Sequence, residues 1–217
     1  MHQVLTRDRR LVLGSERFGS YLNEEFGAHL YSKTRFFDFA TDPRDRERER
    51  PYYRDVALPS YEGAAYLGDK IPLLYLAYQR VHSVFPDARY IVLLRNIFDV
   101  ANSYEARRRN DRDSWSFGVA DAIEHWNALV SFLAVQQGNP RIHLVLYEEF
   151  FGGRQGLGGM YDFLELDPPA NCEEIYHQLT TETARRAGRR TPLLTEEQKL
   201  LIMKTAKFST YQMVLGA

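Results

Sequence analysis

Short runs of apolar residues alternate with longer segments of mixed polarity along the chain. The clearest runs cover residues 11–13, 90–94 and 142–146. Runs of this length, bounded by turn residues, are typical of strands that are buried on both faces of a parallel sheet. Because helix-like segments separate the runs, we predict an α/β fold with a central parallel sheet covered by helices on both faces.

Between these runs the polarity pattern predicts helices, loops and one extended segment. Helices are expected over residues 18–30, 72–84 and 114–137, and from residue 195 onward. Pro72 suits a helix start because the first turn does not need its missing N–H. Residues 33–39 have the aromatic composition of a strand, residues 41–50 read as a charged loop, and residues 51–68 read as irregular structure.

Length and composition indicate a single three-layer α/β/α domain over residues 1–217, without a repeat or an interdomain linker. Hydrophobic residues make up 44% of the chain, which is enough for a proper core. Basic residues number 28 and acidic residues 29, so the overall charge gives no drive toward nucleic acid or membrane. An anion site would therefore be local.

Cys172 is the single cysteine, which excludes an internal disulfide and fits a reducing compartment. The amino end carries no apolar stretch of signal-peptide length, and no run of about 18 apolar residues occurs in the sequence. We expect a soluble cytoplasmic protein with no transmembrane segment. The oligomeric state stays open.

The run at residues 90–94 leads directly into a candidate phosphate site. Ligands of open α/β sheets bind beyond the carboxyl ends of the strands, which is where Arg95 falls. Ser103 lies about two turns into the helix expected next. A guanidinium and a hydroxyl at these positions suit a phosphate. The alternative is an ordinary strand-to-helix junction with a surface arginine.

A second candidate site follows the run at residues 11–13. Gly14 and Gly19 flank Arg17 in a loop that leads toward the helix expected over residues 18–30. Glycine lets backbone N–H groups approach an anion, and a helix amino terminus adds unpaired donors. The sequence Gly-x-x-x-x-Gly-Lys-Ser/Thr is absent from the chain, which argues against an ordinary nucleotide-triphosphate loop.

These two segments resemble those of the sulfotransferases that use 3′-phosphoadenosine 5′-phosphosulfate (PAPS). The stretch Arg-Asn-x-x-Asp-x-x-x-Ser-Tyr from Arg95 resembles their 3′-phosphate segment, with Ile97 in place of the usual proline. The loop from Gly14 resembles their 5′-phosphosulfate loop, Gly-x-x-Arg-Ser-Gly-Thr-Thr-x-Leu. Further matches, in the family's order, are Gly68-Asp69-Lys70-Ile71-Pro72 and residues 142–150 and 160–166, the last two being structural elements.

The resemblance implies a P-loop-like sulfotransferase fold and a role for each matching residue. The 3′-phosphate would bind to Arg95 and Ser103, and Lys70 would reach the transferring sulfuryl group or line the acceptor site. The 5′-phosphosulfate would bind to Arg17, Phe18, Gly19, Ser20 and Tyr21. Two departures concern this loop: Phe18 replaces a serine, and Glu16 adds a negative charge.

A basic segment near the carboxyl end, residues 183–190, loosely resembles the family loop that returns to the 3′-phosphate. Its arginines, which include Arg186 and Arg189, would suit a second phosphate clamp. The alternative is a solvated basic loop before the next helix. Arg107, Arg108 and Arg109 are interpreted as a helix end that meets solvent.

Transfer of a sulfuryl group leaves negative charge on the departing phosphate oxygen, so cations such as Arg17 and Lys70 would lower the barrier. An alcohol acceptor also needs a base, and the sequence favours Asp38 over Asp69, with His29 and His82 behind them. No metal is expected, since no His, Cys and Asp cluster has ligand spacing.

The acceptor is less well defined. Tyrosines between residues 52 and 78 would stack on a sugar or a phenol, or else form the edge of the core. We expect a small-molecule, carbohydrate or lipid acceptor and no nucleic acid. Two other classes stay open: a nucleotide-dependent phosphotransferase, and a catalytically weak or inactive relative that binds nucleotide, to which Glu16 and Phe18 point.

Overall fold

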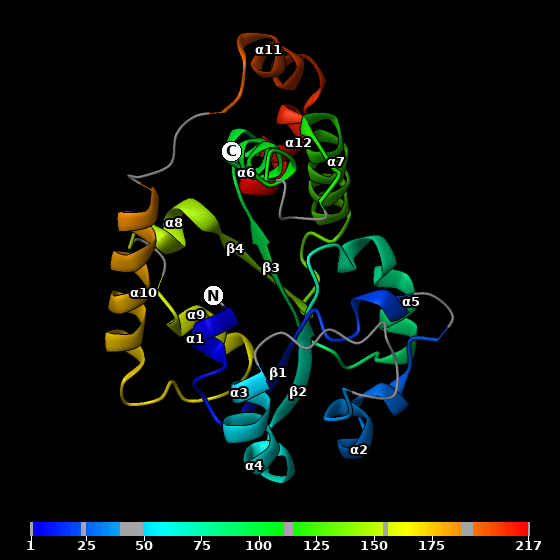
Figure 1. Cartoon of the computed structure of the whole chain (residues 1–217), viewed down its shortest axis with the longest axis vertical. Helices are drawn as coiled ribbons and strands as arrows, with labels where there is room; N and C mark the ends of the chain where they lie inside the picture. The colour runs from blue at the N-terminus through cyan, green and yellow to red at the C-terminus, as the bar shows by residue number, and fades with distance from the viewer. Residues whose placement is uncertain are drawn as a thin grey trace. The chain divides into compact units, whose positions relative to one another are not determined.

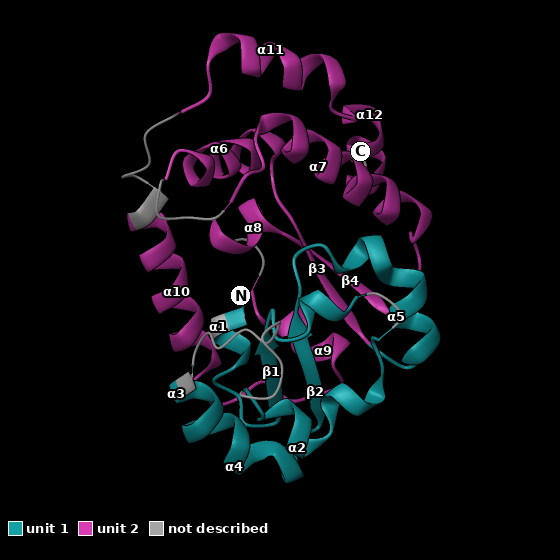
Figure 2. Ribbon diagram, turned by 45° about the vertical axis from the view of Figure 1, so that its right-hand side comes forward, with its two compact units in different colours: residues 1–88 teal, residues 89–217 magenta. Residues whose placement is uncertain are grey.

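The computed structural model describes residues 2–22, 25–39, 50–110, 115–153, 156–187 and 193–216. Contacts divide the chain into two compact units, residues 1–88 and residues 89–217, which are coloured separately in Figure 2. Each unit contains a two-stranded parallel sheet. The expectation of one domain over residues 1–217 stays a prediction.

The first unit combines one small sheet with many short helical turns (Figure 1). Its elements are α1 (His2–Leu5), β1 (Leu11–Ser15), η1 (Gly19–Tyr21), η2 (Ala28–Tyr31), α2 (Lys33–Phe36), α3 (Arg50–Tyr52), η3 (Tyr53–Ala57), α4 (Leu58–Ser60), η4 (Tyr61–Gly63), β2 (Tyr66–Lys70), η5 (Leu74–Ala77) and α5 (Tyr78–Val84). The η elements are 3₁₀ turns except η3, which is a π-helical turn.

Strands β1 and β2 run parallel, with Leu11 opposite Tyr66 and Ser15 opposite Lys70. Two tyrosine hydroxyls from the helical segment accept hydrogen bonds from β1. Tyr52 accepts the N–H of Leu13, and Tyr53 accepts the N–H of Ser15, both at 3.0 Å. These bonds satisfy backbone donors of β1 that do not face β2, so the strand is held from two sides.

Three predictions for this unit are wrong. Among the described residues of the stretch 18–30 there are only the 3₁₀ turns η1 and η2, and residues 33–36 form the helical turn α2 where an extended segment was expected. Residues 51–63 are largely helical and residues 66–70 form β2, where irregular structure was expected. The helix expected over 72–84 begins as η5 and becomes α-helical at Tyr78. The charged residues 41–49 lie outside the described part of the chain.

The physical reason is an aromatic core. Phe18 and Phe36 are fully buried, and their rings meet edge to face with centroids 5.9 Å apart. Tyr31 packs on Phe18 in the same way, and Tyr53 packs on Phe36. These rings therefore owe their burial to one another rather than to pairing in a sheet.

The second unit contains the longer helices (Figure 1). Its elements are β3 (Tyr90–Leu94), α6 (Ile97–Arg108), α7 (Val119–Val135), β4 (Ile142–Leu146), α8 (Tyr147–Phe151), α9 (Gly158–Phe163), α10 (Cys172–Ala187), α11 (Glu196–Thr205) and α12 (Phe208–Leu215). The predicted strand at 90–94 and the strand at 142–146 are confirmed. The helix expected over 114–137 begins later, at Val119, and the helix expected from residue 195 onward is α11, with Thr195 as its N-cap.

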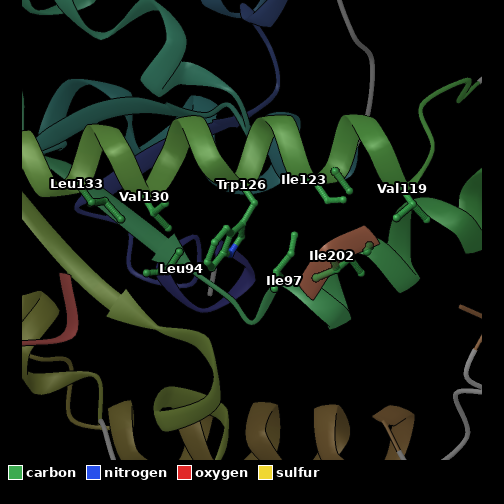
Figure 3. Close-up of a cluster of buried hydrophobic side chains, with 10 residues drawn as sticks. Leu94, Ile97, Val119, Ile123, Trp126, Val130, Leu133 and Ile202 are labelled. Atoms are coloured by element: carbon green, nitrogen blue, oxygen red, sulfur yellow. The ribbon is translucent and has the colours of Figure 1, made fainter. Parts of the chain in front are cut away.

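Strands β3 and β4 are parallel, with Leu94 opposite Leu146. The core of this unit lies between α7, the end of β3 and the start of α6, and Figure 3 shows Val130 and Trp126 of α7 pointing toward Leu94 and Ile97. None of the helices in the described residues is both long and apolar enough to cross a membrane. Parallel pairing is confirmed, but the described strands form two separate pairs and not one central sheet.

Candidate functional site

In the first unit, two segments that lie about fifty residues apart in sequence meet at one edge of the sheet. Parallel strands end at the same edge, and the register places Ser15 beside Lys70. The N–H of Glu16 then donates to the carbonyl oxygen of Lys70 at 2.9 Å. The glycine-containing loop and the segment 68–72 therefore form one site, which we call the β1–β2 edge.

Asp69 closes the inner side of this loop. Its Oδ1 accepts the backbone N–H of Arg17 at 3.1 Å, and its Oδ2 accepts that of Phe18 at 2.7 Å. A Cβ at position 14 would lie 2.6 Å from Oδ1 of Asp69, so glycine is required there for the carboxylate to reach the loop. Burial raises the pKa of Asp69 to about 7, although hydrogen bonds from the two N–H groups favour its charged form.

Lys70 is paired within the loop. Its Nζ lies 2.6 Å from Oε1 of Glu16, in an ion pair that leaves the lysine side chain 40% exposed and the glutamate 18% exposed. Glu16 has a φ of 58°, in the left-handed region that non-glycine residues rarely adopt. The negative charge noted in the sequence therefore lies directly on the predicted catalytic lysine.

The guanidinium of Arg17 donates hydrogen bonds to backbone carbonyls within the first unit. The residue is fully buried, its Nε donates to the carbonyl oxygen of Phe36 at 3.2 Å, and its Nη2 donates to those of Arg35 and Asp38. Its Cζ also lies 4.2 Å from the ring centroid of Phe39. In this arrangement Arg17 fixes residues 35–39 against the loop, and a direct bond to a phosphate would require it to exchange some of these partners.

The other predicted residues of the loop have different exposures. Phe18 is fully buried in the aromatic core, whereas Ser20 is exposed and Gly19 half-buried. The hydroxyl of Tyr21 accepts a hydrogen bond from Nη2 of Arg35 at 2.6 Å. Position 18 therefore serves packing here, and Ser20 is the one of the two predicted hydroxyl residues that is exposed.

Asp38, the predicted base, follows the helical turn α2 and is half-buried. Its backbone carbonyl accepts from Arg17 and, at 3.3 Å, from Nη1 of Arg35. The structure therefore brings Asp38 to the β1–β2 edge through its backbone. The segment reaches this place as a turn tied to Arg17, and not as the expected strand.

In the second unit, Arg95 and Tyr147 follow the paired ends of β3 and β4. The Cζ of Arg95 lies 4.3 Å from the ring centroid of Tyr147, and Nη2 of Arg95 lies 2.9 Å from Oδ2 of Asp99. Trp126 donates its indole N–H to the carbonyl oxygen of Arg95 at 2.9 Å. The side chain of Arg95 is 19% exposed, so the guanidinium is held at the sheet edge and still reaches solvent.

The start of α6 is fixed by two side chains. Asn96 accepts the N–H of Phe98 at 2.8 Å as the helix cap, and Glu148 accepts the N–H of Asn96 at 2.8 Å. Ile97 is 1% exposed and belongs to the core, while Ser103 is half-buried further along α6. The isoleucine that replaces the usual proline thus serves packing.

Tyr147 and Glu148, which contact Arg95 and Asn96, are candidate site residues that the sequence indicated only as structural. Their signal was their place directly after a strand that runs parallel to the strand before Arg95. Because neighbouring parallel strands end at one edge, a residue after β4 comes next to a residue after β3.

The arginines at the end of α6 do not simply meet solvent as predicted. Glu105 is 1% exposed and pairs with Arg108 at 2.8 Å and with Arg109 at 2.7 Å. The hydrogen bond from Arg108 holds the pKa of the Glu105 carboxyl below its usual range. Arg107 lies with its Cζ 3.8 Å from the ring centroid of Trp115. Arg189 and the side chain of Arg186 lie outside the described part of the chain.

Among the residues that the structure describes, no group of three or more His, Cys, Asp or Glu side chains is placed to hold a metal ion. A family model described as "Sulfotransferase family" matches residues 10–183. The chain belongs to the sulfotransferase family. The match includes both strand-end segments described above and the four strands of the described residues, and the family implies the P-loop-like α/β fold. No curated protein and no solved structure gave a match to the chain.

Proposed function

We propose that the protein transfers a sulfuryl group from PAPS to a hydroxyl or an amine of a small-molecule, carbohydrate or lipid acceptor. The observation that carries the proposal is the β1–β2 edge. There the sulfotransferase loop and the lysine segment meet at the carboxyl ends of parallel strands. Membership of the sulfotransferase family supports sulfuryl transfer in general. The cytoplasmic location stays a prediction.

For the 5′ side, we propose that the loop Arg17 to Tyr21 and Lys70 receive the phosphosulfate. Support comes from the 40% exposure of the Lys70 side chain and from the exposed Ser20 on the same loop. Arg17 supports the loop from its buried side, through hydrogen bonds to backbone carbonyls of residues 35–38. On donor binding, the ammonium group of Lys70 would leave Glu16 and pair with the oxygens of the phosphosulfate, which carries more negative charge than one carboxylate.

For the 3′ side, we propose Arg95 and Ser103 as the phosphate ligands, with Arg186 and Arg189 as further ligands. Arg95 is supported by its place after β3 and by the packing of its guanidinium on Tyr147, which limits its motion. A pre-ordered guanidinium loses less conformational entropy on binding an anion. Asp99 holds it through an ion pair that a phosphate would replace.

The reaction would proceed by attack of the acceptor oxygen on sulfur. The bond between sulfur and the bridging phosphate oxygen breaks, the bisphosphate product leaves with the electron pair, and a base takes the hydroxyl proton. We propose Asp38 as this base, because both carboxylate oxygens of Asp69 already accept backbone N–H groups. Asp38→Asn should lower turnover roughly 100-fold to 10,000-fold and leave binding of the bisphosphate unchanged. Normal turnover of this variant would remove Asp38 from the mechanism.

Calorimetry of the whole protein with 3′-phosphoadenosine 5′-phosphate, adenosine 5′-phosphate and ATP tests the donor assignment. We expect the bisphosphate to bind best, and Arg95→Ala to weaken it at least about tenfold while it barely changes binding of adenosine 5′-phosphate. Arg54→Ala, which removes an exposed arginine of the first unit that pairs with Asp55, is the matched control. A preference for ATP, with turnover that needs magnesium, would favour a phosphotransferase instead.

One observation favours the second candidate, a relative that binds nucleotide without efficient turnover. Glu16 neutralises Lys70, the cation proposed to meet the sulfuryl group. An assay with labelled PAPS separates the two candidates. Labelled sulfate transferred to an acceptor or released from PAPS would establish turnover, whereas binding of the bisphosphate with neither would identify the non-catalytic relative.

A further inference from the structure

Asp69 lies against the loop in a way that neither general-base catalysis nor substrate binding requires. Its two carboxylate oxygens accept the N–H groups of consecutive residues, Arg17 and Phe18, across a separation of about fifty positions in sequence. Charge-assisted hydrogen bonds of this kind are roughly twice as strong as neutral ones. The contact fixes the orientation of two successive peptide groups in the donor loop.

The surroundings of the carboxylate are built for this contact. Position 14 has no side chain, and a Cβ there would come within 2.6 Å of Oδ1 of Asp69 and 2.9 Å of Cβ of Arg17. Directly after β1, the N–H of Glu16 donates to the carbonyl oxygen of Lys70, which holds the loop to the end of β2. The loop is thus tied to β2 by one backbone bond and by both oxygens of one side chain.

We propose that Asp69 is the positioning residue of the donor loop: its carboxylate holds the backbone of Arg17 and Phe18 so that the rest of the loop can receive the 5′-phosphosulfate. The inference rests on the proposed function and changes the role of Asp69 from candidate base to scaffold. The opposite possibility is that the carboxylate competes with the donor for the same N–H groups. The two possibilities predict opposite changes in affinity.

Asp69→Asn separates them, because the amide keeps the size of the side chain but has only one accepting oxygen. One of the two N–H groups then faces an NH₂ donor, and the loop loses a fixed peptide orientation. Calorimetry with 3′-phosphoadenosine 5′-phosphate contains no acceptor and no chemistry, so loss of a base cannot change it. We expect the bisphosphate to bind at least about tenfold more weakly than to the wild-type protein.

Further variants keep the test informative. Asp55→Asn makes the same chemical change at an exposed side chain that pairs with Arg54 in the same unit, and it should leave the affinity unchanged. Gly14→Ala keeps the charge of Asp69 but pushes its carboxylate from the loop, and it should weaken binding in the same direction. In an Asp69→Ala background the same Gly14→Ala change should cost less, because the carboxylate that it displaces is gone.

Thermal unfolding of each variant provides the folding control. A loss of affinity in Asp69→Asn without a fall in Tm supports positioning. If Asp69→Asn lowers the Tm, the Gly14→Ala change decides. Positioning predicts that it lowers the affinity less in the Asp69→Ala protein than in the wild-type protein. Unchanged or tighter binding by Asp69→Asn would overturn the inference and leave the proposed function untouched. Failure of the wild-type protein to bind the bisphosphate would overturn the proposed function and the inference with it.

Discussion

The carboxylate of Asp69 accepts two backbone hydrogen bonds, and burial raises its pKa from the ordinary 3.8 to about 7. The native protein therefore holds this proton more tightly than the unfolded chain does. The stability contributed by the neutral carboxyl is complete below the unfolded value of 3.8 and is lost as the pH rises through about 7. Ionisation of Asp69, which strengthens its bonds to the loop, therefore lowers the stability of the folded protein.

This cost gives a prediction for stability against pH. Asp69→Asn cannot ionise, so the Tm of the wild-type protein minus that of the variant should fall by at least about 2 °C as the pH rises from about 5 to about 8. Arg17, Lys70 and Glu16 from the edge, Tyr53 from η3 and His2 from α1 also lie nearby, and all are common to both proteins. Scanning fluorimetry across this range measures the difference. A constant difference would mean that Asp69 does not titrate there.

Glu16 gives the second prediction at this scale. Its carboxylate lies 2.6 Å from Nζ of Lys70, where an incoming phosphosulfate would need the cation. Glu16→Gln should therefore tighten binding of the bisphosphate by roughly threefold or more, and the gain should shrink as salt screens the remaining charges. Calorimetry at low and high salt measures both effects.

The matched control is Glu62→Gln, which also removes a glutamate paired with a lysine at 2.7 Å but lies on an exposed surface of the same unit. It should leave the affinity unchanged. Weaker binding by Glu16→Gln would show instead that the glutamate orients Lys70 for the donor, and the ion pair would then be part of the binding site.

At the scale of elements, the sequence predicts apolar strands such as residues 90–94, in which Tyr90 and Leu94 are buried and the three residues between them are half-buried. It does not predict β2, because Gly68, Asp69 and Lys70 are small or polar and give no apolar run, although Asp69 bonds the loop from this strand. It misassigns residues 33–39 because Phe36 is buried by other rings, and aromatic composition cannot distinguish ring packing from strand pairing.

The candidate site, too, is predictable from the sequence only in part. Arg95, Asp69, Lys70 and the loop can be located from their places at strand ends. Their partners cannot, because the contact of Asp69 with the N–H groups of Arg17 and Phe18 depends on the register of β1 against β2. The same holds for Tyr147, whose ring meets Arg95 only once β3 and β4 are aligned.

The start of α6 allows a prediction about an element. Proline is tolerated at the first helical position, and Asn96, with a φ of −52° and a ψ of 134°, has the backbone that a residue before proline prefers. Ile97→Pro should therefore cost little in backbone terms, yet remove apolar contacts from the core. We expect a loss of about 1–3 kcal/mol in urea unfolding, and about 0.5–1.5 kcal/mol for Ile97→Val. A stabilised Ile97→Pro variant would show that the helix start outweighs the core.

At the scale of the whole molecule, the family match covers parts of both compact units, from residue 10 to residue 183. The proposed function assigns the 5′-phosphosulfate to the loop after β1 and the 3′-phosphate to Arg95 and Ser103. A ligand that carries both phosphates should then protect both segments, whereas one that lacks the 3′-phosphate should act mainly on the loop after β1.

Hydrogen exchange measured by mass spectrometry on the full chain tests this assignment. The bisphosphate should slow exchange in peptides that cover residues 14–21 and in peptides that cover residues 95–103, because bound ligand suppresses local opening of both segments. Adenosine 5′-phosphate should protect residues 14–21 and leave residues 95–103 close to their unbound rates. In Arg95→Ala the bisphosphate should give the pattern of adenosine 5′-phosphate. Protection confined to residues 14–21 with both ligands would mean that Arg95 has no part in recognising the 3′-phosphate.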